Sequence, residues 1–166
     1  PSGSPTRSLA DLKDTIFAGS YISDTGRLAL SYSLLKEEGA TLETFFHRYT
    51  YTYSDEKSIR AIAEFLFDGA AVNGLIYEDM VRTEPDTTRR TRIIELLGPY
   101  GISPVVVPPF LDGEIKEKIR NTLLSADQDE KGREALQVLG VDRFVLIGDN
   151  AYDSLREMAK KVWWAQ

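Results

Sequence analysis

Residues 95–160 read ELLGPYGISPVVVPPFLDGEIKEKIRNTLLSADQDEKGREALQVLGVDRFVLIGDNAYDSLREMAK, an unusual and specific order of elements. An apolar run that ends in prolines predicts a short strand, and apolar residues at helical spacing predict the helices that follow. A Leu-Gly pair closes the second helix, and a Tyr-Asp pair opens the last one. The predicted elements are a strand at 104–107, helices at 114–126 and 131–139, a strand at 144–147 and a helix at 153–164.

The part of the chain before this stretch alternates apolar runs with segments of helical periodicity. Its predicted elements are strands at 14–19, 47–53, 70–76 and 93–97, and helices at 25–38, 55–68 and 77–90, the last interrupted at Pro85. Strands that alternate with helices favour an α/β fold with a mainly parallel or mixed sheet and helices on both faces. In such sheets ligands bind beyond the carboxyl ends of the strands. We therefore expect a site at the strand-to-helix junctions.

The composition is that of an ordinary globular protein. The chain has 166 residues, of which 42% are hydrophobic, and this is enough for one core. A net charge of −6 with mixed signs argues against a nucleic-acid partner, because such proteins concentrate Lys and Arg on one face. The absence of cysteine excludes disulfides, thiol catalysis and cysteine-based zinc sites. Residues 1–10 are interpreted as a linker or a remnant of cloning, and residues 11–166 as a single domain.

Two strand-to-helix junctions carry hydroxyl and carboxylate side chains. The first contains Ser23, Asp24 and Thr25 before a glycine, and the second contains Ser54 and Asp55. Exposed backbone N–H groups beside hydroxyls and a glycine can cradle an anion. The same residue types are also common helix caps, and acidic residues in a first turn interact favourably with the helix dipole. Two similar junctions in one sheet favour a ligand-binding cleft shared by both over a site formed by either junction alone.

The sequence offers little support for catalysis. Its only histidine, His47, is predicted on a strand beside Arg48, where an exposed imidazole is more often a surface residue than a general base. The chain has no nucleophile elbow, Walker loop, Rossmann glycine fingerprint or HExxH motif. We therefore expect no enzyme activity, no catalytic residue, no metal and no cofactor.

Several motifs extend the pattern over most of the chain. They are DLKDTIFA at 11–18, LLK at 34–36, FF at 45–46, FDGAAVN at 67–73, LGVDRFV at 139–145 and YDSLREMAK at 152–160. Together they resemble the PhnD-like periplasmic proteins of ABC transporters that bind phosphate, phosphite or phosphonates. The resemblance implies a periplasmic or extracytoplasmic solute-binding domain with the type 2 periplasmic-binding-protein fold. The chain would be a partial, roughly one-lobe version: lobe two plus the C-terminal segment that normally returns to lobe one. Affinity should be weak unless a partner completes the cleft.

The resemblance also implies site residues and a change of ligand. The family's Ser-Thr-Ser run, which wraps the phosphonate oxygens, corresponds to Ser23, Asp24 and Thr25. Asp55 replaces the family's ligand-contacting histidine, and the aspartate of its NDPF motif falls on Ser103. Two added carboxylates would repel a phosphonate, since unit charges about 4 Å apart interact by on the order of 4 kcal/mol at an effective dielectric constant of about 20. A cationic, zwitterionic or neutral polar solute is therefore expected.

The tryptophans near the end of the chain leave open functions other than solute transport. Trp163 and Trp164 follow two lysines, as residues at a membrane interface before a span often do, or they pack as a final helix turn. The first reading predicts the ligand-sensing domain of a membrane-bound receptor, such as a histidine kinase or diguanylate cyclase. A protein-interaction module with a degenerate pocket is a further alternative. The expected partners are a small-molecule solute and either an ABC permease or a membrane-attached signalling module, with no nucleic acid.

Overall fold

The computed structural model describes residues 1–21 and 24–164, and it divides into two compact units. The first unit contains residues 1–100 together with the C-terminal helix, and the second is Gly101–Tyr152. Since residues 22–23 are not described, the prediction for Ser23 lies outside the described part of the chain. The side chains of Trp163 and Trp164 lie outside it as well. Over the described residues, no helix combines the length and apolar character needed to cross a membrane.

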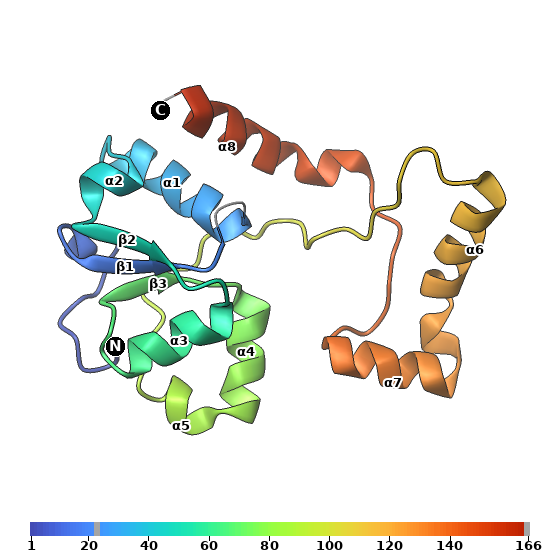
Figure 1. The fold of residues 1–166 in the computed structure, drawn as a ribbon, viewed down its shortest axis with the longest axis horizontal. Coiled ribbons are helices and arrows are strands. Elements are labelled where there is room, and N and C mark those ends of the chain that lie inside the picture. The colour runs from blue at the N-terminus through green and yellow to red at the C-terminus, as the bar shows by residue number, and fades with distance from the viewer. Residues whose placement is uncertain (22–23, 165–166) are drawn as a thin grey trace. The chain divides into compact units, whose positions relative to one another are not determined.

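A parallel sheet with the strand order β2-β1-β3 forms the centre of the first unit. Its strands are β1 (Ile16–Gly19), β2 (Arg48–Tyr51) and β3 (Gly69–Ala71). Its helices are η1 (Ala10–Leu12), α1 (Thr25–Glu37), α2 (Leu42–Phe45), α3 (Asp55–Ala63), α4 (Gly74–Thr83), α5 (Pro85–Thr88) and α8 (Asp153–Trp164). Figure 1 shows α1 and α8 on one side of the sheet and α3, α4 and α5 on the other. The predicted α/β class and parallel sheet are therefore confirmed.

One apolar cluster lies between the sheet and α1 and α2. Its buried members are Leu9, Leu12, Phe17, Leu30, Leu34, Leu42, Phe45 and Phe46. The rings of Phe17 and Phe46 stack with their centroids 4.4 Å apart, which links β1 to the end of α2. On the far side of α1, α8 contributes the buried side chains of Met158 and Val162. This core fixes the positions of the strand ends, and therefore of the junctions that follow them.

Residues 1–10, expected to be a linker, contact the first unit. Leu9 is buried in the core cluster, and the Arg92 guanidinium donates hydrogen bonds to the carbonyls of Ser2, Ser4 and Thr6. The backbone N–H of Ser2 also donates to the carbonyl of Arg90 at 2.8 Å. This segment therefore packs with the fold, and the domain boundaries predicted at residues 10 and 11 stay a prediction.

Most local predictions in the first unit are confirmed, although one predicted strand is absent and another is much shorter than expected. The strands at 14–19 and 47–53 and the interruption at Pro85 are observed, the strands being shorter than expected. The predicted strand at 70–76 ends at Ala71, because the Asn73 side chain accepts a hydrogen bond from the N–H of Leu75 and α4 begins. Residues 93–97 contain no strand. Their Ile94 and Leu97 instead pack against the core cluster, so their hydrophobicity serves packing without sheet pairing.

The second unit is built from short helices and irregular segments. Its helices are α6 (Gly113–Leu124), η2 (Ala126–Gln128), α7 (Glu130–Leu139) and η3 (Asp149–Tyr152). Asp112 and Asp129 cap α6 and α7, and Gly140 ends α7 in the left-handed conformation at φ 68°. The helix predictions are confirmed. The strands predicted at 104–107 and 144–147 are wrong, because neither segment pairs with another in the described chain.

Candidate functional site

Three strand-to-helix junctions meet at the carboxyl edge of the sheet. The β1–α1 junction lies in the middle, because β1 pairs with both β2 and β3 in parallel register. The β2–α3 junction lies on one side of it and the β3–α4 junction on the other. Parallel strands bring the starts of their following helices to one edge. Four of the predicted site residues, Asp24, Thr25, Ser54 and Asp55, belong to these junctions.

Asp55 joins all three junctions. Its Oδ1 accepts a hydrogen bond from the hydroxyl of Ser20 at 2.5 Å and another from the backbone N–H of Asn73 at 3.0 Å. Ser20 follows β1 and is buried, while Asn73 precedes α4. Asp55 is itself half-buried at the first position of α3. One carboxylate oxygen therefore holds the ends of three neighbouring strands together, a role that local sequence pattern does not indicate.

Asp24 occupies the N-terminus of α1 with both of its carboxylate oxygens. Oδ1 accepts from the N–H of Arg27 at 2.5 Å, and Oδ2 accepts from the N–H of Tyr21 at 2.9 Å. Asp24 is thus a helix cap, as one of the two open interpretations predicted. Thr25 begins α1 and is exposed. The carboxylate binds amides that a bound oxyanion would otherwise contact at this helix start.

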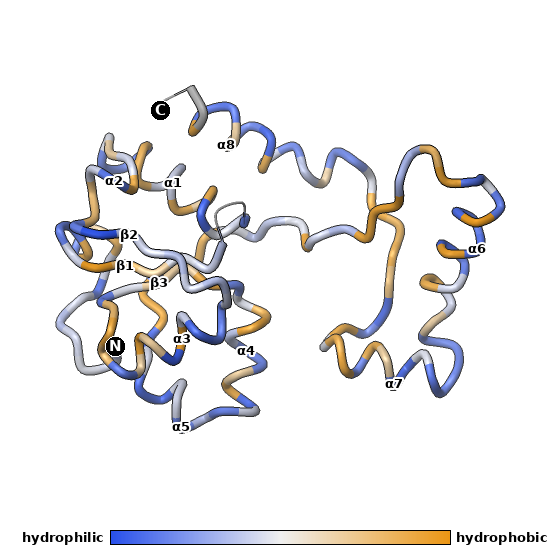
Figure 2. Tube along the Cα trace, viewed as in Figure 1, coloured by the Kyte–Doolittle hydropathy of each residue, from blue (hydrophilic) through white to orange (hydrophobic). Residues whose placement is uncertain are grey.

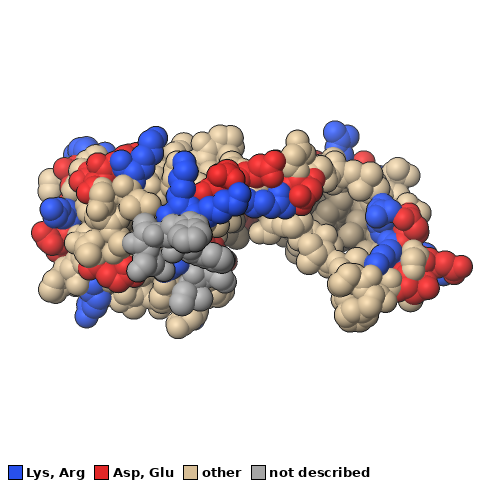
Figure 3. All heavy atoms as spheres, turned by 90° about the horizontal axis from the view of Figure 1, so that it is seen from above, with Lys and Arg blue, Asp and Glu red and all other residues tan. Residues whose placement is uncertain are grey.

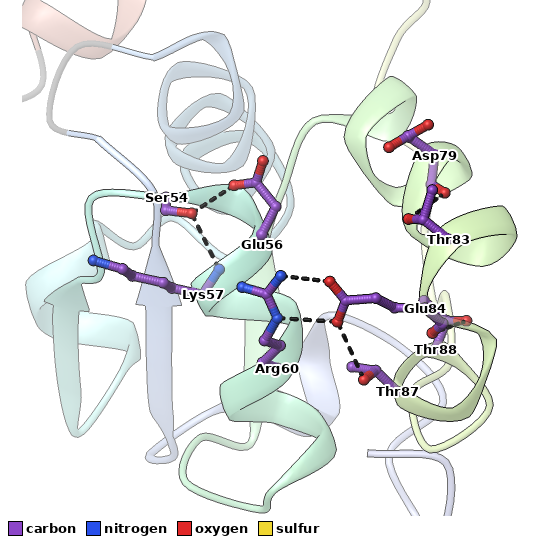
Figure 4. Close-up of polar contacts among 9 residues, drawn as sticks. All are labelled: Ser54, Glu56, Lys57, Arg60, Asp79, Thr83, Glu84, Thr87 and Thr88. Atoms are coloured by element: carbon purple, nitrogen blue, oxygen red, sulfur yellow. Dashed lines mark hydrogen bonds and ion pairs between the residues drawn. The ribbon is translucent and has the colours of Figure 1, made fainter. Parts of the chain in front are cut away.

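Ser54 caps α3 in the same way (Figure 4). Its Oγ accepts from the N–H of Lys57 at 3.1 Å and donates to Oε2 of Glu56 at 2.5 Å. That hydrogen bond from Ser54 lowers the pKa of Glu56 below its ordinary value. One turn further on, Arg60 pairs with Glu84 through two nitrogens, which connects α3 to the start of α5. The Ser54 hydroxyl is therefore engaged within its own helix start.

Aromatic rings flank these caps. Tyr21 and Tyr53 lie edge to face with their centroids 6.4 Å apart, and they are 48% and 66% exposed. Tyr53 has a φ of 60°, in the left-handed region that bulky residues rarely adopt, where the chain turns from β2 into α3. Such backbone conformations often mark functional sites. The two rings form an open aromatic surface beside the capped helix starts.

Behind this surface, the hydroxyl of Tyr49 is buried without a hydrogen-bond partner in the described structure. Its ring contacts those of Phe17, Phe46 and Tyr51, at centroid distances between 5.3 and 6.1 Å. Burial, followed by the charge of Asp24, raises the pKa of Tyr49 well above its ordinary value. A Cβ at position 19 would lie only 2.0 Å from the Tyr49 hydroxyl oxygen, so a larger residue here would have to displace the Tyr49 ring.

A sequence profile described as ABC transporter, phosphonate, periplasmic substrate-binding protein matches residues 1–152. The chain belongs to this family. No curated protein matches the sequence. Membership in the phosphonate-binding family identifies a solute-binding scaffold, and the family is one of binding proteins rather than enzymes.

Solved structures share the fold of this phosphonate-binding family member. A binding protein component of an ABC phosphonate transporter from Pseudomonas aeruginosa matches 99% of this chain, with a TM-score of 0.81 at 20% identity. PhnD1 from Prochlorococcus marinus, solved with methylphosphonate, matches 92% with a TM-score of 0.71 at 21% identity. A Xanthomonas citri protein solved with ATP matches 98% with a TM-score of 0.69 at 20% identity. The present chain spans 56%, 58% and 63% of those three chains, respectively.

The remaining predicted residues of the phosphonate-binding scaffold stay predictions. Ser103 belongs to the second unit, whereas the junctions belong to the first. His47 is exposed and lies one residue before β2. Within residues 1–21 and 24–164, no group of three or more His, Asp or Glu side chains could hold a metal ion. Figure 3 shows basic and acidic side chains intermingled on the face it presents, which fits the mixed composition.

Proposed function

We propose that this chain is an extracytoplasmic solute-binding domain whose ligand differs from the family's phosphonates. The solute would bind at the carboxyl edge of the sheet and be passed to an ABC permease. Ser23, Asp24, Thr25, Ser54, Asp55 and Ser103 are the proposed ligand-binding residues. Capture at this edge needs no catalytic residue, cofactor or metal.

The capped start of α1 is the observation that carries this proposal. Asp24 places a negative charge where an oxyanion would bind, and its two oxygens already engage the amides of Tyr21 and Arg27. An anionic ligand about 4 Å away would be repelled by on the order of 4 kcal/mol at an effective dielectric constant of about 20. It would also have to compete for the same N–H groups. Both effects disfavour a doubly charged phosphonate.

The exposed rings beside the caps favour a cationic group. An ammonium over the face of a tyrosine within about 6 Å gains on the order of 0.5–1 kcal/mol at an exposed site. Tyr21 and Tyr53 offer such faces, and the second oxygen of Asp55 has no described partner. We therefore place cationic and zwitterionic solutes first, with neutral polar solutes after them.

A thermal-shift screen tests the ligand class. The probes are phosphate, methylphosphonate, an amino acid, choline and a polyamine, each over a range of concentrations. A ligand present at 100 times its Kd stabilises the folded chain by about 2.7 kcal/mol. We expect choline, the polyamine or the amino acid to raise the Tm and methylphosphonate to have no effect. The largest shift with methylphosphonate would refute the altered specificity.

The Asp24→Ser variant sharpens this screen, because serine still caps a helix but removes the charge. We expect the variant to gain affinity for methylphosphonate and to lose affinity for cations. Asp86→Ser is the matched control, since Asp86 also lies in the first turn of a helix but is exposed and away from the junctions. Equal responses of the two variants would show that Asp24 does not contact the ligand.

A further inference from the structure

Four tyrosines contact one another in series along β2 and the junctions beside it. Tyr49 meets Tyr51 with ring centroids 5.3 Å apart, and Tyr51 meets Tyr53 at 6.3 Å. Tyr53 in turn meets Tyr21, which follows β1. The series runs outward from the core, because the hydroxyl of Tyr49 is buried whereas Tyr21 and Tyr53 are exposed. The outer pair is therefore supported from behind and open in front.

The surroundings of this outer pair are polar and acidic. Figure 2 shows the connection from β2 to α3 in pale to blue colours, without the orange of aliphatic residues. The backbone N–H of Tyr21 donates to Oδ2 of Asp24 at 2.9 Å, and Asp55 follows Tyr53 by two positions. The face of an aromatic ring carries negative electrostatic potential. Rings beside carboxylates therefore fit a cation better than an apolar partner.

The hydrogen-bond acceptors near the rings are largely occupied. Both oxygens of Asp24 accept backbone N–H groups, and Oδ1 of Asp55 accepts two hydrogen bonds. A primary ammonium has three N–H donors, and donors that leave water without new acceptors weaken binding. A quaternary ammonium donates no hydrogen bond, so it needs only negative charge and ring faces. The occupied caps therefore favour a methylated cation over a primary one.

The two rings are accessible to such a cation. Their planes are inclined at 72°, so a rounded cation can contact both. Over the described residues, the basic side chain that lies over a ring is Lys161, and that ring belongs to α1. We propose that Tyr21 and Tyr53 bind the trimethylammonium group of a choline-type solute. Asp24 and Asp55 supply negative charge to the same site.

The trimethylammonium site rests on the proposed function, because it names the ligand class of the same sheet edge. Isothermal titration calorimetry of this chain with choline, ethanolamine and 3,3-dimethyl-1-butanol tests it. Ethanolamine has the charge of choline without the methyl groups, and the butanol has its shape without the charge. We expect choline to bind at least about tenfold more tightly than either, because ethanolamine leaves donors unpaired and the butanol gains no cation–π attraction.

Replacing each ring with leucine tests the contact itself. Tyr21→Leu and Tyr53→Leu should each weaken choline binding about two- to fivefold, which is the contribution of one exposed ring face. Tyr53→Phe keeps the ring and should retain the affinity. Phe65→Leu is the matched control, since Phe65 is 68% exposed, has a φ of 59° and lies beyond the opposite end of α3. It should leave choline binding unchanged.

Three results would overturn the trimethylammonium site. They are the absence of choline binding, equal binding of choline and either analogue, and equal losses in the Tyr53→Leu and Phe65→Leu variants. Equal binding of choline and ethanolamine, with none of methylphosphonate, would overturn this site and leave the altered specificity intact. The tightest binding by methylphosphonate would refute the proposed function itself.

Discussion

Replacing Asp55 tests whether the junctions are held together as the structure indicates. In Asp55→Ala, the buried hydroxyl of Ser20 loses its acceptor and the N–H of Asn73 loses its own. Asp55→Asn keeps an oxygen at the same place but removes the charge. Comparing the two variants therefore separates the effect of losing the hydrogen bonds from the effect of losing the negative charge that strengthens them. Asp55 is also a candidate ligand contact.

The expected loss in the free energy of unfolding follows from the environment of each of these two hydrogen bonds. A hydrogen bond to a charged group contributes about 1.5–3 kcal/mol, and the partner left behind is the buried Ser20. The bond from Asn73 is exposed, so water can replace it and its contribution is about 1 kcal/mol or less. We expect Asp55→Ala to lower the free energy of unfolding by about 3 kcal/mol and Asp55→Asn by about half as much.

Urea unfolding followed by far-UV circular dichroism measures this loss. With a slope of about 1.5 kcal/mol per molar urea, Asp55→Ala should lower the midpoint by about 2 M. Asp86→Ala is the control, because Asp86 is also acidic and in a first helical turn but has an almost fully exposed side chain. We expect the control to change stability by less than about 0.5 kcal/mol. If Asp55→Ala matched the control, Asp55 would not connect the junctions.

Two further substitutions probe the packing behind the site. Tyr49→Phe removes a buried hydroxyl that has no described partner, so the free energy of unfolding should rise by about 1 kcal/mol, measured by urea titration. Because the pKa of Tyr49 is raised in the folded chain, the unfolded chain loses its proton first, and stability should fall as the pH rises above about 10. Tyr49→Phe should reduce that fall, and an unchanged alkaline profile would contradict the burial of this hydroxyl. Gly19→Ala should lower the free energy of unfolding by on the order of 2 kcal/mol, because its methyl group would meet the Tyr49 hydroxyl. The loss should be smaller when Gly19→Ala is made in the Tyr49→Phe chain. Equal losses of stability in the two chains would show that positions 19 and 49 do not interact.

The local sequence pattern predicted where helices and apolar segments lie better than it predicted which segments pair in a sheet. The helices α1, α3 and α8 have apolar spacing and recognisable ends, and Pro85 starts a new helix as expected. The apolar runs at 104–107 and 144–147 predicted strands because periodicity reports which residues avoid water. It does not report whether a neighbouring strand is present, and here none is found in the described chain.

The same distinction applies to the candidate site. Asp24 and Ser54 could be read as caps because a cap involves residues only a few positions away. The role of Asp55 could not be read, since its partners Ser20 and Asn73 are 35 and 18 positions distant. Contacts of this range depend on strand order, and strand order is a property of the whole sheet. The aromatic pair of Tyr21 and Tyr53 was missed for the same reason.

The return of α8 to the first unit makes residues 101–152 an insertion that is anchored at both ends. α8 is held on α1 by the buried side chains of Met158 and Val162, and the Lys161 ammonium lies 5.5 Å from the ring centroid of Tyr32. This attachment depends on side-chain contacts and does not require an unbroken chain. A single cut by a protease within the insertion would therefore leave two fragments that remain associated through α1 and α8. The first unit could accordingly be reassembled from separate peptides or reconnected in a different order.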